Sequence, residues 1–205
     1  MKIAIIGTGN VGGALATKWA NKGHLIFLGT KDINNFKGKD LLANPKTSVH
    51  SIQEAVQLAD VILMSVPAIA AIETTKLLGN TEGKIIIDSM NIVMNNGPAG
   101  FSNTSDAILA NTQTKDVVKC FNTTGFNNIE NPDYKITSLD LFVAGDSTKG
   151  KEAASQLALD AGFANCYDVG GNNNFTMMEQ FAWFWINLAM VQRHGRDIGF
   201  KLLKR

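Results

Sequence analysis

A glycine-rich turn between an apolar segment and an amphipathic segment constrains the fold of this chain more than any other feature. Gly7, Gly9 and Gly12 directly follow residues 2–6, an apolar run that begins almost at the first residue. Behind the turn, apolar side chains recur at helical spacing until Gly23 ends the pattern. The order is therefore strand, tight turn and helix, which predicts the beginning of a parallel α/β sheet.

The spacing of the three glycines also predicts a phosphate-binding site. In such turns the first glycine permits the bend, the second lets backbone N–H groups approach a pyrophosphate, and the third allows the helix to pack closely on the strand. The positive end of the helix then faces the phosphates. Glycine turns of purely structural use are common, but a strand before the turn and a helix after it favour a dinucleotide site.

The rest of the chain alternates short apolar runs with helical stretches. This alternation predicts a Rossmann-like, doubly wound α/β fold with a mostly parallel sheet and a short helical C-terminal appendage. We expect a dinucleotide-binding domain over residues 1–170, and a helical extension over 171–205 packed on the same domain. The expected strands are residues 2–6, 24–28, 61–66, 84–87, 117–121, 139–144 and 164–169. After the first helix, we expect helices at residues 51–58, 67–78, from about 106, 149–161 and 176–194, with the polar segment 122–137 as loop.

Composition excludes several classes of protein. The chain has a net charge of +1, with 45% hydrophobic and 18% charged residues, which leaves no basic footprint for nucleic acid or an anionic membrane. No apolar run approaches the length of a membrane span, so we expect a cytoplasmic protein without a membrane partner. Cys120 and Cys166 lie in apolar runs without a Cys-x-x-Cys pattern, which predicts free buried thiols and no metal site.

The end of the second expected strand indicates which dinucleotide binds. NAD-binding folds place an Asp or Glu there for the ribose 2′-hydroxyl, whereas this chain has Gly29, Thr30 and Lys31. A hydroxyl and a cation suit a 2′-phosphate, which predicts NADP(H) as the cofactor. Two alternatives stay open, because Lys31 could be a solvated loop cation and a small loop shift could bring Asp32 to the ribose.

Several motifs together resemble a known family. The chain is similar to the deazaflavin-dependent (coenzyme F420) NADP reductases and to the related NADPH-binding domain of STEAP-type ferric reductases. The resemblance extends over nearly the whole chain and rests on the glycine turn combined with further motifs. These motifs are Gly29-Thr30-Lys31, Ser65-Val66-Pro67, Lys119-Cys120-Phe121-Asn122-Thr123, Val143-Ala144-Gly145-Asp146 and Glu179.

The resemblance implies roles for individual residues. It places the pyrophosphate and ribose on the glycine turn, the 2′-phosphate at Thr30 and Lys31, and the nicotinamide side of the cofactor at the Ser65 motif. The cofactor-binding residues implied in this way are Gly7, Thr8, Gly9, Asn10, Val11, Gly12, Thr30, Lys31, Ser65, Val66 and Pro67. The residues expected on the acceptor side are Asn91, Phe121, Asn122, Thr123 and Trp183, with Trp183 assigned from the aromatic cluster of the last helix.

Two departures from the family pattern lie on the acceptor side. The usual Asn-Pro after the fifth strand is replaced by residues 88–92, Asp-Ser-Met-Asn-Ile, and an Arg before the Glu of the last helix is replaced by Thr176-Met177-Met178. They weaken expectations about the acceptor and leave the cofactor prediction intact.

No side chain is expected to act as a catalytic acid. Tyr134 and Tyr167 lack a lysine four residues on, and the three histidines sit in positions that favour structural roles. Hydride transfer between a nicotinamide and a flavin-like ring makes fewer demands than carbonyl reduction, because positioning supplies most of the catalysis. We therefore expect hydride transfer to or from a flavin- or deazaflavin-type acceptor.

Alternatives from two classes stay open. One is reduction of a small imine or carbonyl, which we expect less because such families append a long all-helical domain and only about 35 residues follow the last expected strand. The other is a non-catalytic NADP(H)-binding sensor or partner component. The crowded aromatic residues of the last helix also predict a homodimer interface.

Overall fold

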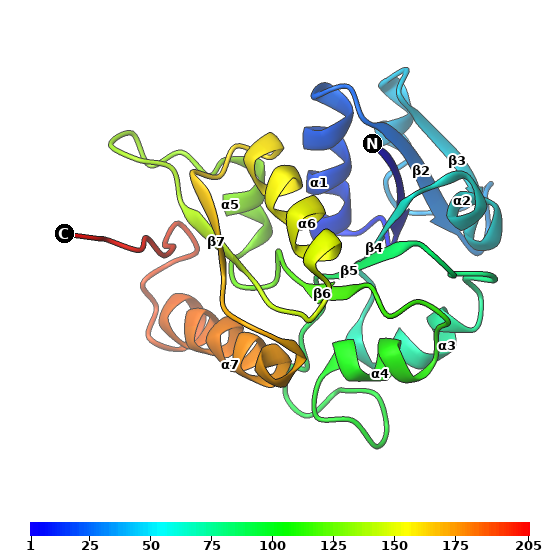
Figure 1. Cartoon of the computed structure of the whole chain (residues 1–205). Coiled ribbons are helices and arrows are strands. Elements are labelled where there is room, and N and C mark those ends of the chain that lie inside the picture. The colour runs from blue at the N-terminus through cyan, green and yellow to red at the C-terminus, as the bar shows by residue number, and fades with distance from the viewer.

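The computed structural model describes all 205 residues and contains a six-stranded parallel sheet with helices on both faces (Figure 1). The strands run in the order β3-β2-β1-β4-β5-β6, so the chain starts in the middle of the sheet and builds outward in both directions. This is the strand order of a doubly wound dinucleotide-binding fold. The strands are β1 (Lys2–Ile6), β2 (Leu25–Thr30), β3 (Thr47–Ser51), β4 (Val61–Met64), β5 (Ile85–Asp88) and β6 (Val117–Lys119).

Helices cover the sheet in two layers. The α-helices are α1 (Asn10–Asn21), α2 (Ile52–Leu58), α3 (Ala71–Thr75), α4 (Thr104–Ala110), α5 (Phe126–Glu130), α6 (Thr148–Asp160) and α7 (Phe175–Ile186). Short 3₁₀ turns are η1 (Lys39–Ala43), η2 (Ala68–Ala70) and η3 (Asn172–Asn174). Core residues of α1, α5 and α6 join one hydrophobic cluster, and those of α2, α3 and α4 join another.

The central strands are apolar on both faces because both faces are covered. Along β1, Ile3 and Ile5 belong to the α1 side, whereas Ala4 and Ile6 belong to the α2 side. All four are at most 1% exposed. The alternation follows from strand geometry, which points successive side chains to opposite faces.

A second, two-stranded parallel sheet carries the C-terminal part of the chain. It consists of β7 (Asp140–Val143) and β8 (Asn165–Asp168), joined to the main sheet by an antiparallel bridge between Lys119 and Ala144. Helix α7 follows, and a π-helical turn, η4 (Asn187–Val191), extends it. Figure 1 shows the C-terminal tail leaving α7 and passing alongside β7.

The fold predicted from the sequence is confirmed, with four local differences. The helix expected over residues 67–78 is instead the 3₁₀ turn η2 followed by the five-residue α3. β3 and α5 were not expected, and the last α-helix ends at Ile186 instead of continuing to His194. α2 begins with a capping box, in which Ser51 Oγ accepts from Glu54 N and Glu54 Oε2 accepts from Ser51 N.

Two further expectations concern the membrane and the cysteines. No helix in the structure is both long and apolar enough to cross a bilayer. Cys120 is buried and Cys166 half-buried, and both thiols are free. Their sulfur atoms lie 3.8 Å apart, and burial raises the pKa of the Cys120 thiol well above its usual range.

Candidate functional site

The three glycines of the opening turn have different surroundings. Gly7 adopts φ +105°, and a Cβ there would lie 2.3 Å from the carbonyl oxygen of Ser65. A Cβ on Gly12 would lie 2.0 Å from the carbonyl oxygen of Gly7. Backbone packing therefore demands glycine at both positions, one to make the turn and one to seat α1 against it.

Gly9 differs from both neighbours because it faces open space. No atom lies within 4 Å of a Cβ built on it, and its backbone is extended. Gly9 is also the N-cap of α1, and no side chain caps the helix there. The first N–H groups of α1 therefore lack a side-chain acceptor, in a cavity of about 500 Å³ lined by Thr8, Gly9 and Asn10. Open space beside uncapped N–H groups fits a bound pyrophosphate.

The end of β2 meets the glycine turn in a second cavity of about 280 Å³. Its lining combines residues from the turn, from the end of β2 and from the segment after β4, all of which the sequence assigns to one site. These residues include Gly7, Thr8, Thr30, Lys31, Val66 and Pro67. Ser65 stands beside them and presents its carbonyl to Gly7.

Lys31 is the one charged residue in the lining of this cavity, and the carboxylate of Asp32 is turned into its own loop. Asp32 Oδ1 accepts hydrogen bonds from the backbone of Asn34 at 2.9 Å and of Asn35 at 3.2 Å. Lys31 is exposed and its ammonium group makes no ion pair. This arrangement leaves a free cation, with no carboxylate opposing it, where a 2′-phosphate would bind.

Lys37 is a candidate ligand that the sequence analysis missed. The loop before η1 folds back over the glycine turn, so that Thr8 Oγ1 donates to the carbonyl of Lys37. Lys37 Nζ then lies 3.4 Å from Asn10 Oδ1, at the N-terminus of α1. Gly38, at φ +91°, makes this approach possible. The signal in the sequence was a Lys-Gly pair in a polar connection, which is too common to single out.

A third cavity, of about 340 Å³, lies where the carboxyl ends of β5 and β6 meet α1, α5 and α7. We call it the acceptor cavity. Two of its lining residues, Asn10 and Val11, belong to the glycine turn, so the acceptor cavity and the phosphate site share this segment of the chain. Its other lining residues are Asn91, Asn122, Thr124, Gly125, Phe126, Ala182, Trp185, Ile186, Met190 and Arg196.

Asn91 and Asn122 form a reciprocal pair at this cavity. Asn91 Nδ2 donates to the backbone carbonyl of Asn122 at 2.8 Å, and Asn122 Nδ2 donates to Asn91 Oδ1 at 2.9 Å. Asn122 Nδ2 also donates to the carbonyl of Met178 on α7 at 3.0 Å. The pair therefore connects the ends of β5 and β6 with the last helix.

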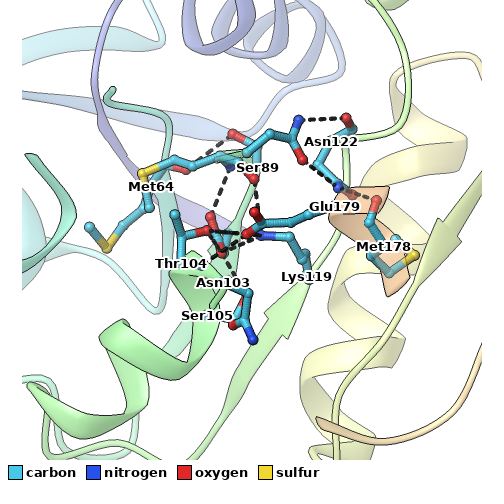
Figure 2. Close-up of polar contacts among 12 residues, drawn as sticks. Met64, Ser89, Asn103, Thr104, Ser105, Lys119, Asn122, Met178 and Glu179 are labelled. Carbon is cyan, nitrogen blue, oxygen red and sulfur yellow. Dashed lines mark hydrogen bonds and ion pairs between the residues drawn. The ribbon is translucent and has the colours of Figure 1, made fainter. Parts of the chain in front are cut away.

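A fully buried charge cluster supports this pair from beneath (Figure 2). Lys119 Nζ lies 2.8 Å from Asp88 Oδ2 and 2.9 Å from Glu179 Oε1, and Lys119 and Asp88 are both inaccessible to solvent. The same ammonium group donates to Thr104 Oγ1 and to the carbonyl of Met90. Buried ion pairs are weak evidence of stability, but removing one partner costs about 3–5 kcal/mol because a charge is left uncompensated.

The cluster also holds the loop that carries Asn91. Asp88 Oδ1 accepts from the backbone of Met90 at 2.9 Å, and Glu179 Oε2 accepts from the backbone of Ile92 at 2.8 Å. The residues on both sides of Asn91 are thus anchored to buried carboxylates. The position of Glu179 explains why a carboxylate occurs in such an apolar helix.

The other residues expected on the acceptor side lie elsewhere. Phe121 is buried in the core, with its ring edge-on to Trp19 at 5.5 Å. Thr123 is buried, and Trp183 is 43% exposed outside the cavity lining. Trp185 lines the cavity instead, and its Nε1 donates to the carbonyl of Ile198 at 2.7 Å. The sequence placed several aromatic residues on this helix but could not tell which one faces inward.

Comparison with known proteins supports the glycine-turn half of the site. Residues 2–92 match the model of the family described as NADP oxidoreductase, coenzyme F420-dependent. The matched segment runs from β1 to the loop carrying Asn91, and the predicted cofactor NADP(H) agrees with the description of the family.

Solved structures share the fold over the whole chain. A candidate F420-dependent NADP reductase from Arthrobacter sp. FB24 superposes with a TM-score of 0.86 at 22% identity, with 100% of both chains covered. A hypothetical protein from Sinorhizobium meliloti gives 0.72 at 20% identity, over 100% of this chain and 96% of the other. An imine reductase from Streptomyces aurantiacus gives 0.69 at 14% identity, covering 94% of this chain but only 64% of the reductase.

Proposed function

We propose that the protein is an NADP(H)-dependent oxidoreductase that transfers hydride between the nicotinamide and a flavin- or deazaflavin-type acceptor. Three features support the proposal: the family model that matches residues 2–92, the positive cavity at Thr30 and Lys31, and an aromatic-lined cavity next to the glycine turn. The chain's own residues would bind and orient both partners.

The binding of NADP(H) would be divided between two ends of the cofactor. Gly9 leaves room for the pyrophosphate, whose charge the uncapped N-terminus of α1 and Lys37 would stabilise. Thr30 and Lys31 would hold the 2′-phosphate, because the carboxylate of Asp32 is engaged by its own loop. Val66 and Pro67 would pack beneath the nicotinamide end.

The side chains that line the acceptor cavity favour one type of reaction over the others. NADP(H) supplies or takes up the hydride when it is bound. None of the lining residues of the cavity has a carboxyl, imidazole or phenol group, and the only ionisable one is Arg196. A reaction that needs no positioned acid fits such a lining, since holding two flat rings at reacting distance supplies most of the rate.

The same observation bears on the alternatives. Reduction of an imine or carbonyl requires a proton donor within hydrogen-bond reach of the reacting atom, and the lining offers none. His24, the most buried histidine, is paired with Asp160 at 2.9 Å and lies outside both the phosphate-side and acceptor cavities. A non-catalytic NADP(H)-binding protein is the remaining alternative. It stays open because residues 88–92 depart from the family pattern.

The test is NADPH oxidation followed by stopped-flow absorbance at 340 nm, roughly the wavelength of the reduced nicotinamide band, with a panel of acceptors. The panel contains riboflavin, FMN, deazaflavin, a quinone, a ferric chelate and a cyclic imine. We expect turnover with the flavin or deazaflavin acceptors and none with the imine. Tight NADPH binding with no turnover across the panel would instead support the non-catalytic alternative.

We also propose a homodimer that uses the outer face of α7 and η4. Trp183, Phe184, Met190 and Val191 are between 43% and 58% exposed on these elements. Exposed apolar patches of this kind commonly mark contacts between copies, which close as two-fold dimers. Light scattering should give the mass of two chains, and the mass of one chain would contradict the proposal.

A further inference from the structure

Asn122 carries a buried hydrogen-bond acceptor that has no partner in the protein. Asn122 is one of the residues that line the acceptor cavity, it is 3% exposed, and its buried Oδ1 makes no hydrogen bond. A buried acceptor without a partner is destabilising and calls for an explanation such as a ligand. We propose that Asn122 Oδ1 accepts a hydrogen bond from an amide or imide N–H of the ring that occupies this cavity. This inference rests on the proposed function and deepens it.

The amide of Asn122 cannot turn to find another partner. Both hydrogens of its Nδ2 are already donated, to Asn91 Oδ1 at 2.9 Å and to the carbonyl of Met178 at 3.0 Å. Rotating the amide would break both bonds and turn Oδ1 toward two oxygen acceptors, Asn91 Oδ1 and the carbonyl of Met178. The orientation of Oδ1 is therefore set before any ligand arrives.

The charge cluster beneath makes this orientation rigid. Lys119 anchors the end of β6, the strand that leads directly to Asn122, and Glu179 anchors α7 one residue from Met178. Asp88 and Glu179 fix the two residues that flank Asn91. Every partner of the Asn122 amide thus sits on backbone that is tied to the same buried cluster (Figure 2). Such preorganisation is how a polar group in a site provides specificity.

The surroundings select a class of donor. Trp185 and Phe126 make the cavity aromatic, which suits a flat ring. Asn91 Nδ2 donates only one of its two hydrogens within the protein, so its second hydrogen would serve a carbonyl beside the ligand N–H. An N–H next to a carbonyl occurs in the carboxamide of nicotinamide and in the imide edge of flavins and deazaflavins. The two sources share the same hydrogen-bonding chemistry.

Two pairs of probes distinguish the sources. The first pair is NADP⁺ and its 3-acetylpyridine analogue, in which a methyl group replaces the amide nitrogen, and dissociation constants are measured by calorimetry. The second pair is riboflavin and N3-methylriboflavin, compared by kcat/KM with NADPH. If the carboxamide is the donor, the wild-type protein should bind the analogue about tenfold more weakly. If the imide is the donor, the methylated flavin should show a comparable loss in kcat/KM.

The variant Asn122→Leu tests whether Asn122 causes the discrimination. Leucine has the same number of side-chain heavy atoms with the same branching, so steric exclusion of a methyl group would persist, whereas discrimination based on hydrogen bonding should fall to a ratio near one. Asn111→Ala is the matched control, because Asn111 Nδ2 also donates to a backbone carbonyl, that of Ala107, and lies at the C-cap of α4 away from the lining. It should keep the wild-type ratios.

The outcomes separate this inference from the proposed function. Equal binding of the two nucleotides by the wild-type protein, with equal or no turnover of the two flavins, would overturn the inference even if the variant fails to fold. 2′,5′-ADP, which contains only the adenosine end of the cofactor, should bind wild type and Asn122→Leu equally. No binding of NADPH to the wild-type protein would overturn the proposed function together with the inference.

Discussion

At the scale of single residues, the three glycines of the turn show how one motif combines structural and binding demands. Gly7 and Gly12 are glycine because neighbouring backbone leaves no room for a Cβ. Gly9 has room on every side, so nothing in the folded protein explains its lack of a side chain. A phosphate in the open space would explain it.

Replacing Gly9 separates folding from binding. The variant Gly9→Val should fold with a melting temperature close to that of the wild type, since no atom lies within 4 Å of the new Cβ. It should bind neither NADPH nor NADH measurably, because the side chain would occupy the position of the pyrophosphate. Thermal unfolding and calorimetry measure the two effects.

Gly12→Ala is the contrasting control and should destabilise the fold, as its Cβ would meet the carbonyl of Gly7. Undiminished NADPH binding by Gly9→Val would remove the turn from the site.

The residues predicted for the phosphate side line neighbouring cavities in the structure, and the sequence could group them because they are close in the chain or end a recognisable strand. It left the role of Asp32 open, since only the folded loop shows that the carboxylate accepts from Asn34 and Asn35. It missed Lys37, which reaches Asn10 through a loop whose path no local pattern encodes.

At the scale of elements, long periodic segments were predicted and short polar ones were not. β3 reads Thr-Ser-Val-His-Ser, a polar edge strand that is recognisable only by its pairing with β2. α5 has five residues, two of them asparagine, and is too short to form without tertiary contacts. In α7 the apolar pattern continued beyond Ile186, but the backbone changes there to the π-helical turn η4.

One carboxylate of β7 anchors the last residues of the C-terminal tail. Asp140 accepts hydrogen bonds from Lys201 Nζ at 2.8 Å, Asn165 Nδ2 at 2.8 Å and Leu202 N at 2.9 Å. Burial alone would raise the pKa of Asp140, but these bonds outweigh it and hold the pKa below its ordinary value. A carboxylate with a lowered folded-state pKa stabilises the protein above its unfolded pKa, near about 4, and the stabilisation is lost as pH falls through the folded value.

The variant Asp140→Ala should therefore lower the free energy of unfolding by about 1–3 kcal/mol at neutral pH. The difference between wild type and variant should shrink below about pH 4, as Asp140 becomes protonated in the wild type. Urea titrations at pH 7, 5, 4 and 3 measure it. Glu73→Gln is the control, because Glu73 pairs with Lys76 on an exposed surface and should matter little at any pH. A difference that stays constant from pH 7 to 3 would contradict the role of the charge.

At the scale of the whole molecule, the fold could be predicted because several independent sequence signals indicate the same architecture. Apolar runs of strand length, capped helices and the glycine turn all favour a doubly wound sheet, and the strand order places their carboxyl ends along one edge. The buried cluster could not be predicted, because Asp88, Lys119 and Glu179 come from three distant elements. The signal was present as a lysine within the apolar run 117–121 and a glutamate within an aromatic helix.

The central claim is that an NADP-type 2′-phosphate binds at Thr30 and Lys31 of the glycine-turn site. Its most direct test is calorimetric titration of NADPH and NADH into the wild-type protein and Lys31→Ala. The wild type should prefer NADPH, and the variant should lose about 1–3 kcal/mol of NADPH binding free energy while NADH binding stays nearly unchanged, since one charge-assisted contact is removed. Equal weakening of both cofactors, or no preference in the wild type, would contradict it.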